Sequence, residues 1–483
     1  MAITKQDALR RIEENSALLY GLSDTVWDHP ETAFQEYVSA KALCDTLTEL
    51  GFSVKKGIAD IDTAFSASFG RGRPIIGLLA EFDALSGLSQ KSGVATKSPL
   101  VADGAGHGCG HNLLGVGAIA AALGIKKYLE GDNREGTVIV FGCPGEEGGS
   151  GKSFMARDGV FDDIDFALTW HPGDFNLASV DSSLANTQIK YRFSGISSHA
   201  SASPEMGRSA LDAAELMNVG VQFLREHVRP NVRIHYAFTN AGGFSPNVVQ
   251  SYSELLYLIR APNNQEVEEI HRRVTAIAEG AALMTETKME EIFVKACSNI
   301  VPNRTLCEVL RKNLGETPLP RFDDADQAFA KEIIDSFETR DEGLKPFVRR
   351  YSKKEDRRLL EEHASDALLN FILPILEGEE TMTASSDVGD VSWVCPTAQI
   401  SATTMAAGTP GHSWQLVAQG KSPIAHKGML FAGKVIAGAA IDVLDDPRIL
   451  QSAKREHRER VGEKPFSSPI PKDVRPTAIG SDN

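Results

Sequence analysis

Apolar runs that end in polar side chains recur three times in the first 175 residues of this chain. The segments are PIIGLLAEFDAL at 74–85, TVIVFGCPGEEGG at 137–149 and DFALTWHPG at 165–173. Each has the short, β-branched and leucine-rich pattern of a buried strand, and a helix-like segment rich in alanine separates the first two. This alternation predicts an α/β fold, in which sites form beyond the carboxyl ends of the strands.

The hexapeptide HGCGHN, residues 107–112, follows the first of these strands. Its Cys109 and His111 lie two residues apart, so that in an extended segment both side chains point to one side. Sulfur and imidazole nitrogen on one face favour a transition metal. A buried thiol in a tight turn between two solvent-facing histidines would give the same pattern, so the remaining ligands have to come from elsewhere.

Glu146 and Glu147 follow a strand and a Pro-Gly turn, where adjacent carboxylates can diverge. One can bind a cation while the other takes a proton from a metal-activated water. Paired glutamates are common on surfaces, but the apolar strand and the surrounding glycines favour a catalytic pair. His171 and His412 complete a donor set for one or two divalent ions. His171 could instead be a capped core residue, and His412 could be an exposed loop residue.

The middle of the chain has a different order of predicted strands and helices. Between 189 and 297 the predicted elements follow the order strand–helix–strand–strand–helix–strand, which is that of a ferredoxin-like unit. We therefore expect an inserted domain at 185–300 between two parts of an α/β domain, 1–184 and 301–483. Residues 315–360 are charged and proline-spaced and are interpreted as a surface excursion, in part helical, whose role the sequence leaves open.

Composition limits the class of protein. A net charge of −15 over 483 residues argues against a nucleic-acid binder, which needs a basic surface. The chain has no run of about 18 apolar residues and no apolar signal-peptide core near its start, so we expect no membrane span. Six scattered cysteines without a disulfide framework then predict reduced thiols and a cytoplasmic enzyme.

A set of short motifs occurs in the order found in a known family. The motifs are HPETAFQEYVSAKALCDTLTELGF, AEFDAL, HGCGHN, PGEEGG, TWHP, SSHAS, GGFSPNVV and GHSWQ. Together they span most of the chain, which resembles the metal-dependent aminoacylase and carboxypeptidase (amidohydrolase) family. The resemblance implies a zinc-exopeptidase-like α/β catalytic domain with an inserted lid domain that mediates dimerisation.

The resemblance also implies roles for individual residues. Glu146 matches the family's general base, and Asp83 matches the catalytic aspartate that supports the metal site. His199, in SSHAS, matches a lid histidine expected to reach an active site, either its own or that of a partner in a dimer. Asn247 and Arg260 match positions that contact the substrate carboxylate or shape the lid, although Arg260 could equally cap a strand. The residues that match metal ligands are Cys109, His111, Glu147, His171 and His412.

Some positions depart from the common family pattern. Asn112 stands where most relatives have an aspartate, and CPGEE replaces the usual QPAEE. Within 385–397, which we expect to be a loop, both Asp387 and Asp390 lie where relatives often carry an acidic residue beside the metals. The sequence does not say which of the two matches. None of these changes removes a donor, but they weaken any inference from the family about which substrate this chain takes.

The expected activity is hydrolysis of the amide bond in a small N-acyl amino acid or dipeptide-like substrate, such as p-aminobenzoyl-glutamate. One or two zinc or manganese ions would serve as cofactor. We expect a homodimer, and the alternative arrangement is a hetero-oligomer with a related chain. The competing functions are a deacetylase of amino sugars or diamino acids and a non-catalytic or regulatory metal-binding subunit. The complete set of donors and base favours the enzyme.

Overall fold

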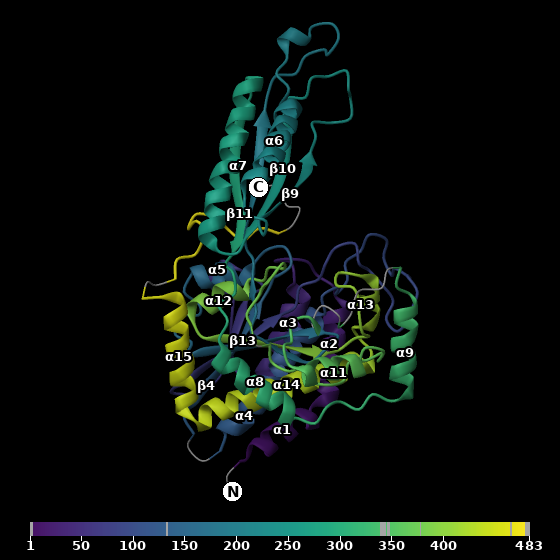
Figure 1. Ribbon diagram of the computed structural model, residues 1–483, viewed down its shortest axis with the longest axis vertical. Coiled ribbons are helices and arrows are strands. Elements are labelled where there is room, and N and C mark those ends of the chain that lie inside the picture. The colour runs from purple at the N-terminus through teal and green to yellow at the C-terminus, as the bar shows by residue number, and fades with distance from the viewer. Residues whose placement is uncertain are drawn as a thin grey trace.

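The computed structural model consists of a large unit from which a smaller, elongated unit projects, as Figure 1 shows. The large unit contains a seven-stranded sheet and the small unit a four-stranded one. The residues that the structure describes are 3–131, 134–338, 344, 348–376, 378–463 and 466–478.

The seven-stranded sheet has the strand order β1-β2-β4-β3-β5-β13-β6. Its four central strands, β4, β3, β5 and β13, are mutually parallel, while β1, β2 and β6 pair antiparallel at the two edges. The carboxyl ends of the parallel strands therefore meet at one edge of the sheet. The strands span β1 Ser53–Lys56, β2 Phe65–Arg71, β3 Ile75–Glu81, β4 Gly136–Cys143, β5 Phe166–Gly173, β6 Leu177–Ser179 and β13 Thr397–Thr403.

Helices cover both faces of this sheet because successive side chains of a buried strand point to opposite sides. In β4, Val138 and Val140 join the core beneath α4 (His111–Leu129) and α14 (Pro423–Asp445). The side chain between them, Ile139, joins a second core with α5 (Gly151–Arg157) and α12 (Val388–Val394).

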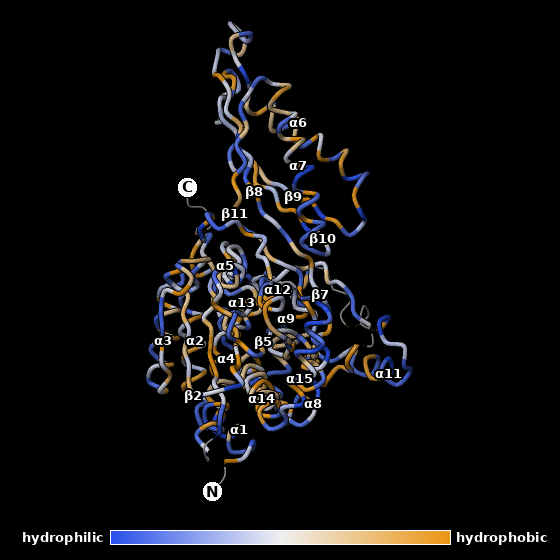
Figure 2. Tube along the Cα trace, turned by 90° about the vertical axis from the view of Figure 1, so that its left-hand side faces the viewer, coloured by the Kyte–Doolittle hydropathy of each residue, from blue (hydrophilic) through white to orange (hydrophobic). Residues whose placement is uncertain are grey.

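The central helix α4 packs on the sheet beside α14, and its trace runs mostly orange through the large unit in Figure 2. By length and composition alone it could cross a membrane, but 89% of its apolar window is buried within the protein. Its hydrophobicity is therefore explained by its position in the core. The remaining helices of this unit are α1 Lys5–Glu14, α2 Ser16–Asp28, α3 Tyr37–Glu49, α8 Arg304–Glu316, α9 Asp324–Asp335, α11 Lys354–Glu362, α13 Trp414–Gln419 and α15 Pro447–Val461.

Helices lie in the segment predicted as a loop and in the excursion predicted to be in part helical. The expected loop at 385–397 includes α12, whose residues Val388 and Val391 are buried. The expected excursion at 315–360 contains α9, which packs Ala330 against the loop and helix that follow β13. Part of the excursion, 339–343 and 345–347, lies outside the described residues. The helix α12 has only seven residues, too few for a helical periodicity to be recognised in the sequence.

The small unit runs in the order β8, α6, β9, β10, α7, β11, which is the order that the sequence predicts. Its sheet has the antiparallel strand order β11-β8-β10-β9, and both helices lie on one side of it, as Figure 2 shows. Side chains from this face and from the helices form a hydrophobic core of their own. The elements span β8 Ala185–Ser194, α6 Ala210–Leu224, β9 Arg233–Asn240, β10 Tyr252–Ala261, α7 Asn264–Thr285 and β11 Lys288–Cys297.

The carboxyl group of Glu36 is buried near Asp83, close to the carboxyl end of β3. Glu36, at the start of α3, accepts hydrogen bonds from the Phe34 backbone N–H and the Thr63 hydroxyl, both at 2.9 Å. Burial, and then the nearby charge of Asp83, raise the pKa of Glu36 to about 8. Because the folded state disfavours the ionised carboxylate, this residue makes stability depend on pH.

We predict that Glu36→Gln reduces this pH dependence. The folded-state pKa lies above the ordinary value of 4.5, so the contribution of Glu36 is full below that pH and is lost as the pH rises through about 8. The loss amounts to about 1.4 kcal/mol per pH unit across that window. Glutamine keeps the shape and hydrogen-bonding capacity but cannot ionise, so the variant should gain stability relative to the wild type as the pH rises. Thermal unfolding from about pH 5 to about pH 8 measures the difference, with exposed Glu215→Gln as control. A difference that stays constant would contradict the prediction.

Candidate metal centre

The carboxyl edge of the seven-stranded sheet brings together donors from distant parts of the chain. Cys109 belongs to two sets whose donor atoms all lie within 4.8 Å of one another. One set adds His111 and His171, and the other adds Glu147 and His412. Within these sets, Cys109 Sγ lies 3.4 Å from His171 Nε2, and Glu147 Oε1 lies 3.3 Å from His412 Nε2. All five predicted donors therefore lie close together around Cys109 at this edge of the sheet.

Hydrogen bonds on the far side of two imidazole rings orient them toward this place. His111 Nδ1 donates to Asp83 Oδ1 at 2.9 Å, and His171 Nδ1 donates to the Pro172 carbonyl oxygen at 2.7 Å. A carboxylate or carbonyl oxygen can only accept, so each ring carries its proton on Nδ1 and keeps the Nε2 lone pair free. The second oxygen of Asp83 accepts the Glu147 backbone N–H at 3.0 Å. Asp83 thus fixes one ring and the backbone of one carboxylate donor.

The donor set fits a divalent metal. His111 Nε2 and Glu147 Oε1 are buried, and among the described residues neither has a hydrogen-bond partner. Buried polar atoms are rarely left without one, so these two require another partner. A cation between them and the Cys109 sulfur would supply it, and a mixed set of sulfur, nitrogen and oxygen donors suits a transition metal.

The adjacent glutamates lie in opposite electrostatic environments. Burial opposes ionisation of Glu147, but the neighbouring imidazoles of His412 and His111 lower its pKa to about 2. Burial, followed by the carboxylates of Glu81 and Asp387, raises the pKa of Glu146 well above its usual value. Neighbouring groups whose pKa values are pushed apart are suited to separate tasks, one as a charged ligand and one as a proton acceptor and donor.

Glycines allow the loops at this edge to approach closely. Gly110 has a φ of +76°, and a Cβ there would lie 3.0 Å from the Pro172 ring. A Cβ at Gly149 would lie 2.4 Å from the ring of Phe34, which packs beneath the Glu146 loop. The positive φ and the close contacts explain the spacing of glycines in both motifs.

The residues expected to contact substrate do not all join this cluster. Arg260, at the base of the small unit, donates from Nη1 to Ser385 Oγ at 3.0 Å. His199 and Asn247 are exposed in the loops that follow β8 and precede β10, at the opposite end of the same sheet. Eight residues separate the Asn186–Arg260 pair from the Ser194–Tyr252 pair, and they span about 27 Å of strand.

Sequence reasoning missed two residues beside the donors. Glu81 Oε2 lies 3.3 Å from His111 Nε2, and Glu81 Oε1 lies 2.8 Å from the Nζ of fully buried Lys152. Lys152 Nζ also lies 2.6 Å from Asp387 Oδ1, whereas Asp390 binds Ser153. Glu81 could have been noticed because it stands two residues before Asp83 and so faces the same way. Lys152 carried no such signal, since lysines are almost never fully buried.

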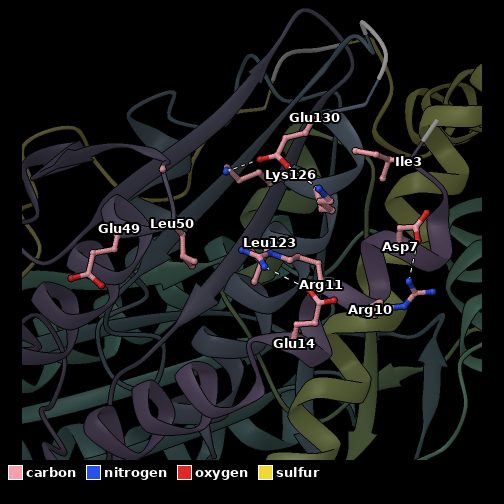
Figure 3. Close-up of a pocket in the computed structure, with 12 residues that line it drawn as sticks. Ile3, Asp7, Arg10, Arg11, Glu14, Glu49, Leu50, Leu123, Lys126 and Glu130 are labelled. Carbon is pink, nitrogen blue, oxygen red and sulfur yellow. Dashed lines mark hydrogen bonds and ion pairs between the residues drawn. The ribbon is translucent and has the colours of Figure 1, made fainter. Parts of the chain in front are cut away.

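The cleft drawn in Figure 3, of about 910 Å³, lies elsewhere. It lies beside the carboxyl-terminal end of α4, where Lys126 and Lys127 line it, about 24 Å along the helix from His111. Arg10, Arg11 and Lys126 each pair with an acidic residue in the same cleft, so its charges are balanced. We assign it no part in the chemistry.

Comparison with known proteins agrees with this geometry. The family model described as Peptidase family M20/M25/M40 matches residues 77–464. The chain belongs to this family. It is 47% identical over 97% of its length to the B subunit of p-aminobenzoyl-glutamate hydrolase from Escherichia coli (strain K12), of which it covers 98%. It is also 31% identical to the Xaa-Arg dipeptidase of Mus musculus, over 65% of this chain and 71% of that protein. Membership makes the chain a metal-dependent hydrolase of amide bonds.

Solved structures share the fold at low sequence identity. A putative aminohydrolase from methicillin-resistant Staphylococcus aureus aligns with a TM-score of 0.62 and 17% identity, covering 91% of this chain and all of that one. A Bacillus subtilis dinuclear metal-binding peptidase of family M20 aligns with a TM-score of 0.54 and 16% identity, covering 90% and 99%. The fold of the family therefore extends over most of the chain.

We predict that metal removal destabilises this protein through the donors at the sheet edge. At a metal concentration 100 times the dissociation constant, binding contributes about 2.7 kcal/mol to the free energy of unfolding, and chelation should remove it. Cys109→Ala should show a smaller chelator-dependent shift in unfolding temperature than the wild type. Cys395→Ala, which removes another buried thiol, is the matched control and should keep the full shift. Equal shifts in both variants would exclude Cys109 as a ligand.

Proposed function

We propose that this protein hydrolyses the amide bond of an N-acyl amino acid conjugate, with p-aminobenzoyl-glutamate as the leading candidate substrate. The observation that carries the proposal is the cluster of five donors around Cys109 with Glu146 beside it. The 47% identity to one chain of the E. coli hydrolase, along the whole sequence, supports the choice of substrate. A deacetylase of amino sugars or diamino acids would use the same cluster and differs only in the acyl group and amine.

Each residue of the cluster has a distinct part in the proposed reaction. A zinc or manganese ion bound there supplies Lewis acidity for polarising the amide carbonyl and activating water. Asp83 holds His111 in the tautomer that leaves Nε2 free. Glu146 accepts the proton of the attacking water and passes it to the leaving nitrogen. Arg260, whose buried Nε has no hydrogen-bond partner among the described residues, is placed to bind the substrate carboxylate.

Two ions are the arrangement that we favour. Cys109 is common to both donor sets, so His111 and His171 would hold one ion and Glu147 and His412 another, with the Cys109 sulfur available to either. The dinuclear B. subtilis peptidase supports this arrangement. A thiolate favours zinc, while the carboxylate and imidazole donors also accept manganese.

We further propose that residues 185–300 form a ferredoxin-like lid and dimerisation domain, with 1–184 and 301–483 as the catalytic domain. The edge strand β9 lacks a neighbour on one side, and an edge of this kind can pair with another chain. Apolar side chains on β9 and α6 are exposed beside it, and exposed apolar patches mark interaction sites. These side chains are Leu216, Val219, Phe223, Tyr236 and Phe238.

A homodimer across this edge explains where His199 and Asn247 lie. They are too far along the lid to join Arg260 in their own chain, so we place them in the active site of the partner subunit. A hetero-oligomer is the second possibility, because the E. coli hydrolase has two different subunits and both of them are similar to this chain. Six free cysteines support a cytoplasmic location.

The isolated chain supplied with zinc or manganese should hydrolyse p-aminobenzoyl-glutamate or another N-acyl amino acid from a substrate panel. Glu146→Gln should lower turnover by about 10²- to 10⁴-fold, because it removes the proton acceptor. Elemental analysis should find nearly the same metal content as in the wild type. A wild-type chain that binds metal but turns over no amide would favour the non-catalytic role, and equal loss of metal and activity in Glu146→Gln would make Glu146 a structural residue.

Mixing two inactive variants tests whether His199 acts across subunits. His199→Ala and Glu146→Gln should each be nearly inactive alone. After co-expression, a mixed dimer contains one site with an intact Glu146 and the intact His199 of the other chain, so activity should return. If His199 acts within its own chain, every site in the mixed dimer stays defective and no activity returns. Sedimentation of both variants verifies that they still dimerise.

A further inference from the structure

Lys152 is the unusual residue beside the metal centre. Its side chain has no exposed surface, and its ammonium group contacts two carboxylates from different parts of the chain. Glu81 ends β3 in the first half of the sequence, whereas Asp387 precedes α12 in the second. Asp387 holds Lys152 twice, because its other oxygen accepts the Lys152 backbone N–H at 2.8 Å. The lysine thus connects the Glu81 and Asp387 carboxylates, which come from distant parts of the chain.

A contribution to stability does not explain this arrangement. Removing three charged groups from water costs free energy that their mutual attraction offsets only in good geometry. Apolar side chains of the same volume often stabilise a fold as well or better. A buried lysine beside the reacting groups is better explained by what it holds in place.

The carboxylate that Lys152 holds faces the metal centre. Glu81 Oε1 pairs with the ammonium, which leaves Oε2 directed at His111 Nε2, 3.3 Å away. Nε2 is the ring nitrogen that Asp83 leaves free. The nearest donor atoms of Glu81, His111 and Glu146 all lie within 4.8 Å of one another. Without an anchor on Oε1, Glu81 could rotate toward the donors or away from them.

We propose that Lys152 is a positioning residue of the hydrolase, which ties Glu81 to Asp387 and thereby fixes the Glu81 carboxylate beside the metal-facing nitrogen of His111. The inference rests on the proposed metal centre but not on the identity of the substrate. The lysine itself is not expected to touch substrate, because two carboxylates already occupy its ammonium group. Its effect passes through Glu81 to the geometry around the metal.

The test replaces the native metal with cobalt(II), whose visible absorption bands report ligand geometry without any substrate. Lys152→Met, which keeps the length and removes the charge, should shift or weaken these bands. It should also lower kcat by about 10- to 100-fold, with a smaller change in KM, as loss of partners that orient metal ligands does. Glu81→Gln should change the same bands. Lys427→Met, which breaks an ion pair with buried Asp326 elsewhere, is the matched control and should keep the wild-type bands.

A second variant separates positioning from folding. Lys152→Met combined with Asp387→Asn restores the charge balance of the cluster but still leaves Glu81 without its anchor. If the lysine positions Glu81, the cobalt bands and kcat remain altered in this folded double variant. If the lysine only balances charge for folding, the double variant recovers the wild-type spectrum and kcat, and the proposal is overturned. Wild-type bands in Lys152→Met would overturn it as well.

These outcomes are distinct from failure of the proposed function. If the wild type binds cobalt but hydrolyses no N-acyl amino acid, the substrate assignment fails while the spectra still test Lys152. If the wild type binds no metal, both proposals fail together. Rescue by Lys152→Arg, which restores a cation able to contact both carboxylates, would support positioning over a general packing role.

Discussion

The carboxylate of Asp83 joins the two halves of the metal centre. One oxygen accepts the proton of His111 Nδ1, and the other accepts the backbone N–H of Glu147. The first bond sets the tautomer of an imidazole, and the second sets the position of the loop that carries both glutamates. Because β3 and β4 are adjacent and parallel, one side chain just beyond the end of β3 can reach both the start of α4 and the loop after β4. The rest of the site depends on this short connection.

Charge is the second constraint on the site. The edge of the sheet collects Glu81, Glu146, Glu147 and Asp387 within a largely buried region. A buried cluster of carboxylates is costly unless cations compensate it. Lys152 compensates one side of the cluster, and the donors around Cys109 suit a metal on the other. Lys152 therefore offsets the charges of Glu81 and Asp387, and a metal at the Cys109 donors would offset those of the carboxylates that face it.

The small unit extends the protein well beyond the large unit, as Figure 1 shows. Its sheet is anchored at the base, where Arg260 meets Ser385, and extends for the full length of β8 and β10. Because β8 and β10 pair along ten residues, the loops at the far tip lie far from Arg260 in the same chain. The proposed dimer would give the motifs at the tip a role and would make assembly and catalysis interdependent.

Strand and helix positions in both units could be read from the sequence because buried strands and long helices have strong local patterns. The order of elements in the small unit also followed from local patterns, and the five donors predicted from motifs and resemblance lie close together. Local sequence did not reveal the short helix α12, which begins within a polar loop, or the edge strands β1 and β6. The strand β6 pairs with β13, which comes from the last part of the chain.

Tertiary structure alone determined how these parts work together. The sequence could not choose between Asp387 and Asp390, because only folding shows that Asp387 reaches Lys152 while Asp390 turns toward Ser153. It could not show that a lysine is buried, since burial depends on partners supplied by strands and helices hundreds of residues apart. Nor could it place His199 and Arg260 at opposite ends of one sheet. Residue types and their spacing determined which chemistry is available, and long-range packing determined which residues share it, because contacts between distant segments leave no periodic signal in the chain.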